Sequence, residues 1–371
     1  MSQTSSTLGD RPTVAVLYGG ASPEHPVSCI SASAILATLD PEHYRVVPVG
    51  ITRSGTWVPG LADPAGAIPA GADLPEVAEP GPGGVRLALS ADPARPGELR
   101  VLSGPNKGAV HAVADVVFPV LHGPNGEDGT IQGLLELSGV PYVGPGVLAS
   151  AAGMDKERTK NLLAAAGLPI GEQVVLHPGE GLDVAQRERL GLPVFVKPAR
   201  GGSSIGISRV ADWAELDAAL ALARRHDWKV IVERGIDGAE VECGVLQHPD
   251  GSLLASAPAL LRGTGDSAEG FYGFETKYLD DVVEAEIPAP IGEAATAELQ
   301  RVARAAFRAL GCDGLARVDF FVTESGPVIN EINTMPGFTP ISMYPKMLAA
   351  TGVAYPELLD ILVRRALVAR R

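Results

Sequence analysis

Two acidic residues near the C-terminal end of the chain occupy positions from which a β-hairpin would turn them toward each other. The apolar runs 318–322 and 327–332 are separated by Glu324-Ser325-Gly326, which predicts two strands joined by a three-residue loop. In the register that this loop sets, Asp319 lies directly opposite Glu331. Opposed carboxylates repel each other by some tenths to about 1 kcal/mol unless a cation lies between them. The hairpin therefore indicates a cation site.

The same register places Arg317 opposite Asn333, and side-chain alternation along the strands turns all four polar residues to one face. Carboxylate and amide oxygens suit Mg²⁺ or Mn²⁺, hard cations that usually keep some waters and take other ligands from phosphates. We therefore expect a divalent metal at a nucleotide site. The alternative is a solvated hairpin in which Arg317 neutralises both acids. The flanking Val, Phe and Ile residues argue against a solvent-exposed surface that has no function.

A lysine and a glycine-rich loop form a second candidate site. Lys197 closes the apolar run 194–196, the residues PARGGSSIG follow, and 207–210 returns as a strand. Backbone N–H groups next to small residues can approach a phosphate closely, so this segment is predicted to be a phosphate-binding flap. It is not a P-loop, because the sequence lacks G-x-x-x-x-G-K-[ST]. An ordinary glycine-rich hairpin is the alternative.

Two polar residues follow predicted strands in the first third of the chain. Glu24 lies between the strand 14–18 and a helix predicted over 27–39, where it either complements the helix N-terminus or contacts a substrate amine. His122 begins the loop after the strand 115–121, at a strand end where ligands of open α/β sheets bind. It either binds a ligand there or orders its own loop.

The elements that would carry these residues alternate between strand and helix, which predicts an α/β enzyme of two or three domains with ample cores. Residues 60–97 are rich in Pro and Gly and are typical of a loop, and 263–281 is typical of a long loop that often forms a lid. Further strands are predicted over 46–51, 230–233 and 241–246, and further helices over 130–137, 213–224, 294–310 and 151–166, the last capped by Ser150.

Composition limits the partners and the compartment. The chain has 371 residues and a formal net charge of -14, which argues against broad binding to nucleic acid or to an anionic membrane. Its three cysteines, Cys29, Cys243 and Cys312, are far apart and form no CxxC pair, which favours reduced thiols. Residues 1–12 are polar and no apolar run approaches about 18 residues, so we expect a soluble cytoplasmic protein.

Taken together, the motifs resemble the ATP-grasp superfamily, and within it the family of D-alanine:D-alanine ligases. The resemblance runs from Val14 to about Val363 and rests on motifs in a fixed order: GGASPEHPVS, HGPNGEDGTIQG, MDKERTK, VKPARGGSSIG, ERGIDGAEVECG, FETKY, ARVDFF and NEINTMPGFTP. It implies a three-domain α/β architecture, in which an N-terminal Rossmann-like domain is followed by two α+β domains that sandwich ATP. The implied domains are 1–145 with a variable insertion at about 60–110, 146–233 with the phosphate flap, and 234–371 with the lid loop and the metal hairpin.

The resemblance also implies an ATP-dependent ligation of two D-alanines through a D-alanyl phosphate, for peptidoglycan synthesis. It implies two Mg²⁺ or Mn²⁺ ions, a monovalent cation, a homodimer, and neither nucleic acid nor membrane as a partner. The implied metal ligands are Asp319, Glu331 and Asn333, and the implied ATP contacts are Lys156, Lys197, Ser204, Glu233, Ile236, Glu240, Phe271 and Asn333. The implied substrate contacts are Glu24, His122, Lys277, Ser342 and Met343, and the implied catalytic groups are Glu24, Ser203, Tyr278, Arg317 and Gly337.

These residue types suit the chemistry of such a ligation. A carboxylate is a poor acyl donor, so it must first attack the γ-phosphate of ATP, with metals and lysines spreading the charge. An amine then attacks the acyl phosphate, and Arg317 with the backbone N–H of Gly337 would stabilise the oxyanion. Because water would hydrolyse the acyl phosphate, a lid over the site is expected.

Two other functions stay open on the sequence. A ligase that joins D-alanine to D-lactate or D-serine is the nearer alternative, although D-lactate ligases place a histidine in a differently built lid where this chain has Lys277-Tyr278. A non-catalytic nucleotide-binding sensor is the other. The lid also departs from the Tyr-Asp-Tyr-Glu that is common in the family, because this chain has Tyr272-Gly273-Phe274-Glu275.

Overall fold

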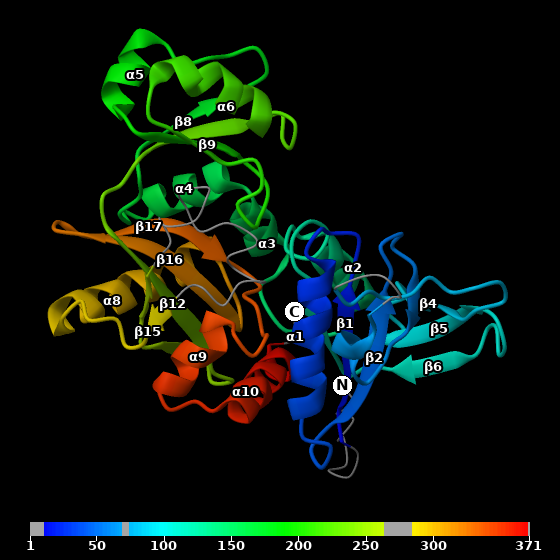
Figure 1. Cartoon of the computed structure of the whole chain (residues 1–371). Helices are drawn as coiled ribbons and strands as arrows, with labels where there is room; N and C mark the ends of the chain where they lie inside the picture. The colour runs from blue at the N-terminus through cyan, green and yellow to red at the C-terminus, as the bar shows by residue number, and fades with distance from the viewer. Residues whose placement is uncertain (1–10, 69–73, 263–283, 370–371) are drawn as a thin grey trace.

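The computed structural model describes residues 11–68, 74–262 and 284–369. Their strands form three sheets, and Figure 1 shows an N-terminal unit in blue and cyan, a small central unit in green and a third unit that ends in orange and red. The predicted α/β class is confirmed. Among the described residues, no helix is long and apolar enough to cross a membrane.

The N-terminal unit is built on a strand that is buried on both faces. All seven residues of β1 (Thr13–Gly19) are buried, which is why its sequence is apolar throughout rather than alternating. It pairs in parallel with β2 (Arg45–Ile51) and β7 (Val116–Val120), and α1 (His25–Thr38) and α2 (Thr130–Ser138) pack into the cores on opposite faces. The sheet continues through the antiparallel strands β3 (Trp57–Pro59), β4 (Arg86–Leu89), β5 (Glu98–Ser103) and β6 (Val110–Val113).

The prediction of a loop over 60–97 is only partly correct. This stretch contains the 3-10 helix η1 (Pro64–Gly66) and the strand β4, whose Leu87 and Leu89 are buried in the core of the sheet. The strand is only four residues long, so its alternation is too brief to stand out among the surrounding Pro and Gly residues.

The central unit is an antiparallel sheet with a core of its own. Along β9, Val194 and Val196 point into this core, whereas Phe195 and Lys197 point to the opposite face and line a cavity. In spatial order the strands are β10 (Ser208–Val210), β9 (Val194–Pro198), β11 (Val230–Arg234) and β8 (Gln173–Leu176), and the helices are α5 (Val184–Leu190), η2 (Trp213–Glu215) and α6 (Leu216–Ala223).

The third unit is a larger antiparallel sheet with α8 (Glu293–Leu310) packed on it. The helices α3 (Val147–Met154) and α4 (Lys156–Ala165) pack on this sheet and on α8, so they belong to its core. The division into 1–145, 146–233 and 234–371 stays a prediction. The strands are β12 (Ala239–Gln247), β13 (Leu253–Ala255), β14 (Ala259–Arg262), β15 (Glu284–Glu286), β16 (Leu315–Thr323) and β17 (Gly326–Asn333).

The prediction of a single helix over 151–166 is wrong, because the helix is interrupted at Asp155. This residue has an extended backbone and caps α4 by accepting a hydrogen bond from the N–H of Arg158 at 3.2 Å. Ser150 is not a cap, since it lies inside α3 and donates to the carbonyl of Pro145. The break makes Lys156 the first residue of α4, and its N–H reaches the carbonyl of Ala199 in the central unit at 2.9 Å.

The predicted register of the metal hairpin is confirmed, but its loop is built differently. Asp319 pairs with Glu331, and Arg317 pairs with Asn333. Thr323 pairs with Gly326, so the turn has two residues rather than the predicted three. A β-bulge then leaves Asn330 without an opposite residue, and this extra residue restores the register expected from a longer loop.

The N-terminal and third units share one apolar core. It combines residues of β1, β7 and α1 with residues of α9 (Met343–Ala350) and α10 (Tyr355–Val368). Figure 1 shows α10, in red, between α1 and α9. The central unit has its separate core, and its contacts with α4 include hydrogen bonds and ion pairs.

Candidate active site

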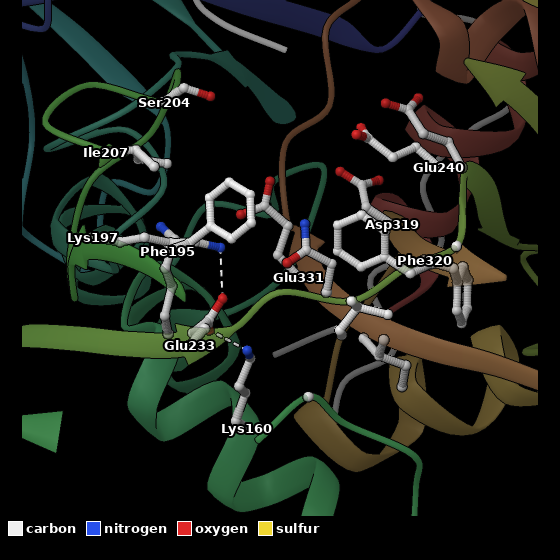
Figure 2. A pocket seen from close by; sticks show the side chains of 18 of the residues that line it. Lys160, Phe195, Lys197, Ser204, Ile207, Glu233, Glu240, Asp319, Phe320 and Glu331 are labelled. Atoms are coloured by element: carbon white, nitrogen blue, oxygen red, sulfur yellow. Dashed lines mark hydrogen bonds and ion pairs between the residues drawn. The ribbon is translucent and has the colours of Figure 1, made fainter. Parts of the chain in front are cut away.

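A cavity of about 270 Å³ lies between the central and third sheets. One wall comes from β9, β11 and the loop after β9, and the other comes from β12, β16 and β17. This cavity brings together nine of the predicted site residues, which are Lys156, Lys197, Ser203, Ser204, Glu233, Ile236, Glu240, Asp319 and Glu331. Figure 2 shows the lysines and Glu233 on one side and the carboxylates of Glu240 and Asp319 on the other.

Glu233 lies between two lysines at the base of this cavity (Figure 2). Lys197 Nζ is 2.6 Å from one carboxylate oxygen, and Lys160 Nζ donates to the other. Burial alone would raise the pKa of Glu233, but the charges of Lys160 and Lys197 outweigh it and lower the pKa to about 2. Glu233 is therefore ionised at neutral pH.

Lys160 is a site residue that the sequence analysis missed, because charged residues on helices are usually solvated. It is only 3% exposed, and burial, opposed by the charge of Glu233, lowers its pKa. One signal was available: Lys156 and Lys160 both fall in the first turns of α4, where the positive helix end disfavours cations. Two lysines there indicate acidic partners elsewhere in the fold.

The predicted phosphate flap follows β9 and reaches the N-terminal unit. Lys156 Nζ donates to the carbonyl of Gly201 at 2.7 Å, which fixes the start of the flap. Ser203 and Ser204 have φ values of 52° and 57°, a left-handed conformation that is strained for residues other than glycine. Ser203 Oγ donates to a carboxylate oxygen of Glu24, which connects the flap to the start of α1. The cavity and Glu24 thus belong to one site.

The hairpin carboxylates lie beside a third acid that the sequence analysis did not single out. Arg317 holds Asp319 through two contacts of 2.7 Å, and its Nε is also 3.3 Å from Glu242 on β12. Glu242 pairs with Asp319, so Glu242, Asp319 and Glu331 form one row across three strands. Local sequence cannot reveal this row, because it depends on the pairing of β12 with β16.

The residues of the hairpin fit a divalent metal only in part by themselves. The predicted ligands are two carboxylates and one amide, and the described part of the chain gathers no group of three His, Cys, Asp or Glu side chains that could hold a metal ion. Mg²⁺ commonly takes one or two carboxylates and completes its shell with waters and substrate phosphates. The donor set therefore fits a metal that arrives with a nucleotide.

Of the predicted site residues outside this cavity, His122 lies in the N-terminal unit, in the loop after β7. His122 is buried, with Nδ1 3.2 Å from the carbonyl of Met335 and Nε2 3.2 Å from Ser31 Oγ. Both ring nitrogens contact protein atoms, which favours the alternative in which His122 orders a loop. Burial lowers its pKa to about 4, so the ring is neutral at pH 7.

Gly337 and Ser342 lie next to each other in the loop after β17. A Cβ at Gly337 would come within 2.6 Å of Ser342 Oγ, so any other residue there would require the Ser342 side chain to move. Met343 follows as the first residue of α9. Three predicted site residues, Phe271, Lys277 and Tyr278, lie outside the described residues, as does the whole of the predicted lid loop.

Comparison with known proteins places the chain. The family model for the D-ala D-ala ligase N-terminus matches residues 13–145, and the model for the C-terminus matches residues 162–364. The D-alanine–D-alanine ligase of Corynebacterium jeikeium is 61% identical over 363 residues, which cover 96% of this chain and 97% of that protein.

Solved structures agree with the sequence comparison. The VanG D-Ala:D-Ser ligase from Enterococcus faecalis has a TM-score of 0.81 at 35% identity and covers 96% of this chain and 100% of its own. The D-alanine–D-alanine ligase from Coxiella burnetii has a TM-score of 0.81 at 33% identity, with coverages of 98% and 95%. The Bacillus anthracis enzyme, complexed with ATP, has a TM-score of 0.70 at 26% identity, with coverages of 97% and 98%. The chain therefore belongs to the D-alanine–D-alanine ligase family of ATP-grasp enzymes.

Proposed function

We propose that this chain joins two D-alanines into D-alanyl-D-alanine, with conversion of ATP to ADP and phosphate. One contact carries the proposal: Ser203 of the flap donates a hydrogen bond to Glu24 at the start of α1. It connects a cavity with lysines and carboxylates suited to ATP to a carboxylate suited to a substrate ammonium. A reaction between ATP and an amino acid requires this combination.

The nucleotide would bind in the cavity between the central and third sheets. Glu233 is ionised there, so it can accept a hydrogen bond from a base, and Lys197 beside it can reach a phosphate. Among the residues that line the cavity, the proposed contacts are Glu233, Ile236 and Glu240 for the base and ribose, and Lys156, Lys197 and Ser204 for the phosphates. On the resemblance, Phe271 and, through the metal, Asn333 are proposed as further contacts.

Asp319, Glu331 and Asn333 would hold two Mg²⁺ or Mn²⁺ ions together with the nucleotide phosphates. Metals bound there would neutralise phosphate charge during phosphoryl transfer. On the family resemblance, we also propose a monovalent cation near this site. Arg317, which contacts Asp319 in this structure, lies at the end of the hairpin where a substrate carboxylate would come.

The first D-alanine would place its ammonium at Glu24. Its carboxylate attacks the γ-phosphorus, the bond from that phosphorus to ADP breaks, and D-alanyl phosphate forms. The backbone N–H of Gly337 and the guanidinium of Arg317 then stabilise the oxyanion that forms when the second amine attacks the acyl carbon. Phosphate leaves with the electron pair of the broken acyl bond.

The second D-alanine would bind through its carboxylate to Ser342 and Lys277, beside Met343. Its ammonium must lose a proton before attack, and a water or base near Ser203 and Tyr278 would accept that proton. Further proposals rest on the resemblance and on three free cysteines: a homodimer that acts in the cytoplasm, with neither nucleic acid nor membrane as a partner.

The test is ADP release with ATP and Mg²⁺ and with D-alanine, L-alanine, or D-alanine plus D-lactate or D-serine, followed by mass identification of the product. We expect release that depends on D-alanine, with D-alanyl-D-alanine as the main product. A main product that contains D-lactate or D-serine would overturn the substrate assignment. Nucleotide binding without turnover under any D-amino acid would indicate a sensor.

A further inference from the structure

Three side chains of the N-terminal unit contact the loop that follows the metal hairpin. Ser31 lies on α1, and His122 and Glu127 lie in the loop after β7. Ser31 and His122 are buried and Glu127 is partly buried. We call these three residues the bracket, because together they hold both ends of the segment Met335–Phe338.

One end of the segment is held through both backbone groups of Met335. Its N–H donates to Glu127 Oε1 at 3.2 Å, and its carbonyl is 3.2 Å from His122 Nδ1. The other oxygen of Glu127 accepts a hydrogen bond of 2.6 Å from the N–H of Gly123. Glu127 thus ties a loop of the N-terminal unit to a loop of the third unit.

The other end is held through Ser31. The N–H of Phe338 donates to Ser31 Oγ at 3.3 Å, and Ser31 Oγ is 3.2 Å from His122 Nε2. Because the carbonyl of Met335 can only accept, His122 Nδ1 must carry the proton, and in a neutral ring Nε2 accepts from the Ser31 hydroxyl. The polar chain from Phe338 to Met335 is therefore closed, with each donor matched to an acceptor.

The segment held in this way contains the N–H of Gly337. Phe338 anchors the segment in the shared core, with its ring 5.7 Å from that of Phe118. Gly337 itself is half-buried and lies beside Ser342. Apolar packing fixes where the segment lies, and directional hydrogen bonds fix how its peptide groups are turned.

We infer that Ser31, His122 and Glu127 are positioning residues for acyl transfer, which hold the N–H of Gly337 in place by fixing the backbone of Met335 and Phe338. This inference rests on the proposed function, in which that N–H stabilises the oxyanion. An oxyanion donor acts over a narrow range of distances, and a displacement of about 1 Å can cost about 100-fold in rate. His122 thereby acts through the loop rather than through a substrate contact.

The first variant is Glu127→Gln. Both side-chain oxygens of Glu127 accept from backbone N–H groups, whereas the amide nitrogen of glutamine cannot accept, so one hydrogen bond is lost. We expect kcat to fall about 10- to 100-fold while the KM for ATP is unchanged, because the nucleotide cavity is intact. Glu136→Gln is the matched control: this exposed glutamate on α2 accepts from Tyr142 at 2.8 Å, and its change should leave kcat unaltered.

A pair of His122 variants separates positioning from simple loss of stability. The amide of His122→Asn can still donate to the carbonyl of Met335, whereas His122→Ala cannot. We expect kcat per folded enzyme, measured well below each melting temperature, to fall more in the alanine variant than in the asparagine variant. A role confined to stability would lower the melting temperature and leave kcat per folded enzyme equal in both.

Amide hydrogen exchange tests the bracket independently of the substrate. In Glu127→Gln, a peptide covering residues 335–338 should exchange faster than in the wild type, and in Glu136→Gln it should not. Unchanged exchange together with wild-type kcat in Glu127→Gln would overturn the inference. If the wild type releases no ADP with D-alanine, but residues 335–338 still exchange faster in Glu127→Gln than in the wild type, the proposed function is overturned and the role of the bracket in holding the segment is retained.

Discussion

Two junctions between units of the described chain are formed by different kinds of contact. The N-terminal and third units share an apolar core, to which the bracket with Glu127 adds directional hydrogen bonds. The central unit meets α4 through hydrogen bonds and ion pairs, including those of Glu233 and of Lys229, whose Nζ is 2.6 Å from Asp155 and 2.7 Å from Glu157. The first junction is therefore mainly apolar, and the second is formed by polar and charged side chains.

Two glutamates show the same contrast in their pKa values. Glu233 lies between two lysines, which lower its pKa to about 2 against the effect of burial. At Glu127, desolvation and the charge of Glu24 raise the pKa to about 8. The difference follows from neighbours rather than residue type.

Function gives a reason for the contrast. On the proposed function, a nucleotide enters between the central and third sheets, and a junction of polar contacts can open without exposing an apolar core. The groups that stabilise an oxyanion must instead be preorganised, which a shared core provides. We therefore expect changes at the polar junction to act on nucleotide binding and changes at the apolar junction to act on turnover.

The largest effect is expected at the hairpin on the nucleotide side. Glu331→Gln removes the negative charge of a proposed metal ligand, so kcat/KM with Mg²⁺ should fall at least about 100-fold. Because the change also relieves repulsion with Asp319, the melting temperature without metal should not fall. Glu324→Gln in the exposed turn of the same hairpin is the control and should change neither quantity. A large loss of stability in Glu331→Gln would contradict the metal role.

A smaller effect is expected from Lys160→Met at the polar junction. Breaking a buried ion pair costs about 3–5 kcal/mol of stability, and Lys197 would be drawn to Glu233 as its remaining partner. We expect the affinity for ATP, measured by calorimetry, to fall at least about tenfold. Lys346→Met, at an exposed position on α9, should bind ATP as the wild type does. Equal affinities in the two variants would separate Lys160 from the nucleotide site.

The pH dependence of stability should have opposite signs at the two glutamates. The folded-state pKa of Glu233, about 2, lies below 4.5, so its contribution to stability is present above pH 4.5 and is lost as pH falls toward 2. The folded-state pKa of Glu127, about 8, lies above 4.5, so its contribution is present below pH 4.5 and is lost as pH rises through 8. The melting temperature of Glu233→Gln should therefore depend less on pH than that of the wild type below pH 4.5. The melting temperature of Glu127→Gln should depend less on pH than that of the wild type between pH 4.5 and 8. Changes on the same side in both would contradict the contrast.

The smallest effect is expected from Glu242→Gln. Arg317 would then be held chiefly by Asp319 and would compete with the metal for that carboxylate. We expect the Mg²⁺ concentration for half-maximal activity, and for thermal stabilisation by a nucleotide, to rise a few-fold. An unchanged Mg²⁺ requirement would show that Glu242 does not share Arg317 during the reaction.

Sequence alone predicted the parts of the site that depend on local order. Strand periodicity was enough to place Asp319 opposite Glu331, although the turn is shorter and the bulge at Asn330 restores the register. The flap after Lys197 and the strand end at His122 were likewise local features. The break at Asp155 was missed, because a polar residue between two helical stretches looks like part of one helix.

The residues that the sequence analysis missed all depend on contacts between distant segments. Lys160 acts through Glu233, 73 positions away, and Glu127 contacts Met335, 208 positions away. Glu242 joins the row of carboxylates only because β12 pairs with β16. Such roles arise from how the units are packed together, which periodicity within one segment does not contain.

The most direct test compares two variants in one pair of measurements. For Lys160→Met and Glu127→Gln, we would measure the dissociation constant of a non-hydrolysable ATP analogue with Mg²⁺, and kcat for D-alanine-dependent ADP release at saturating ATP. The prediction is a crossed result: Lys160→Met loses nucleotide affinity and keeps much of its kcat, and Glu127→Gln keeps the affinity and loses kcat. If both variants lose nucleotide affinity and kcat to a similar extent, the polar junction does not act mainly on nucleotide binding, nor the apolar junction mainly on turnover, and the account is contradicted.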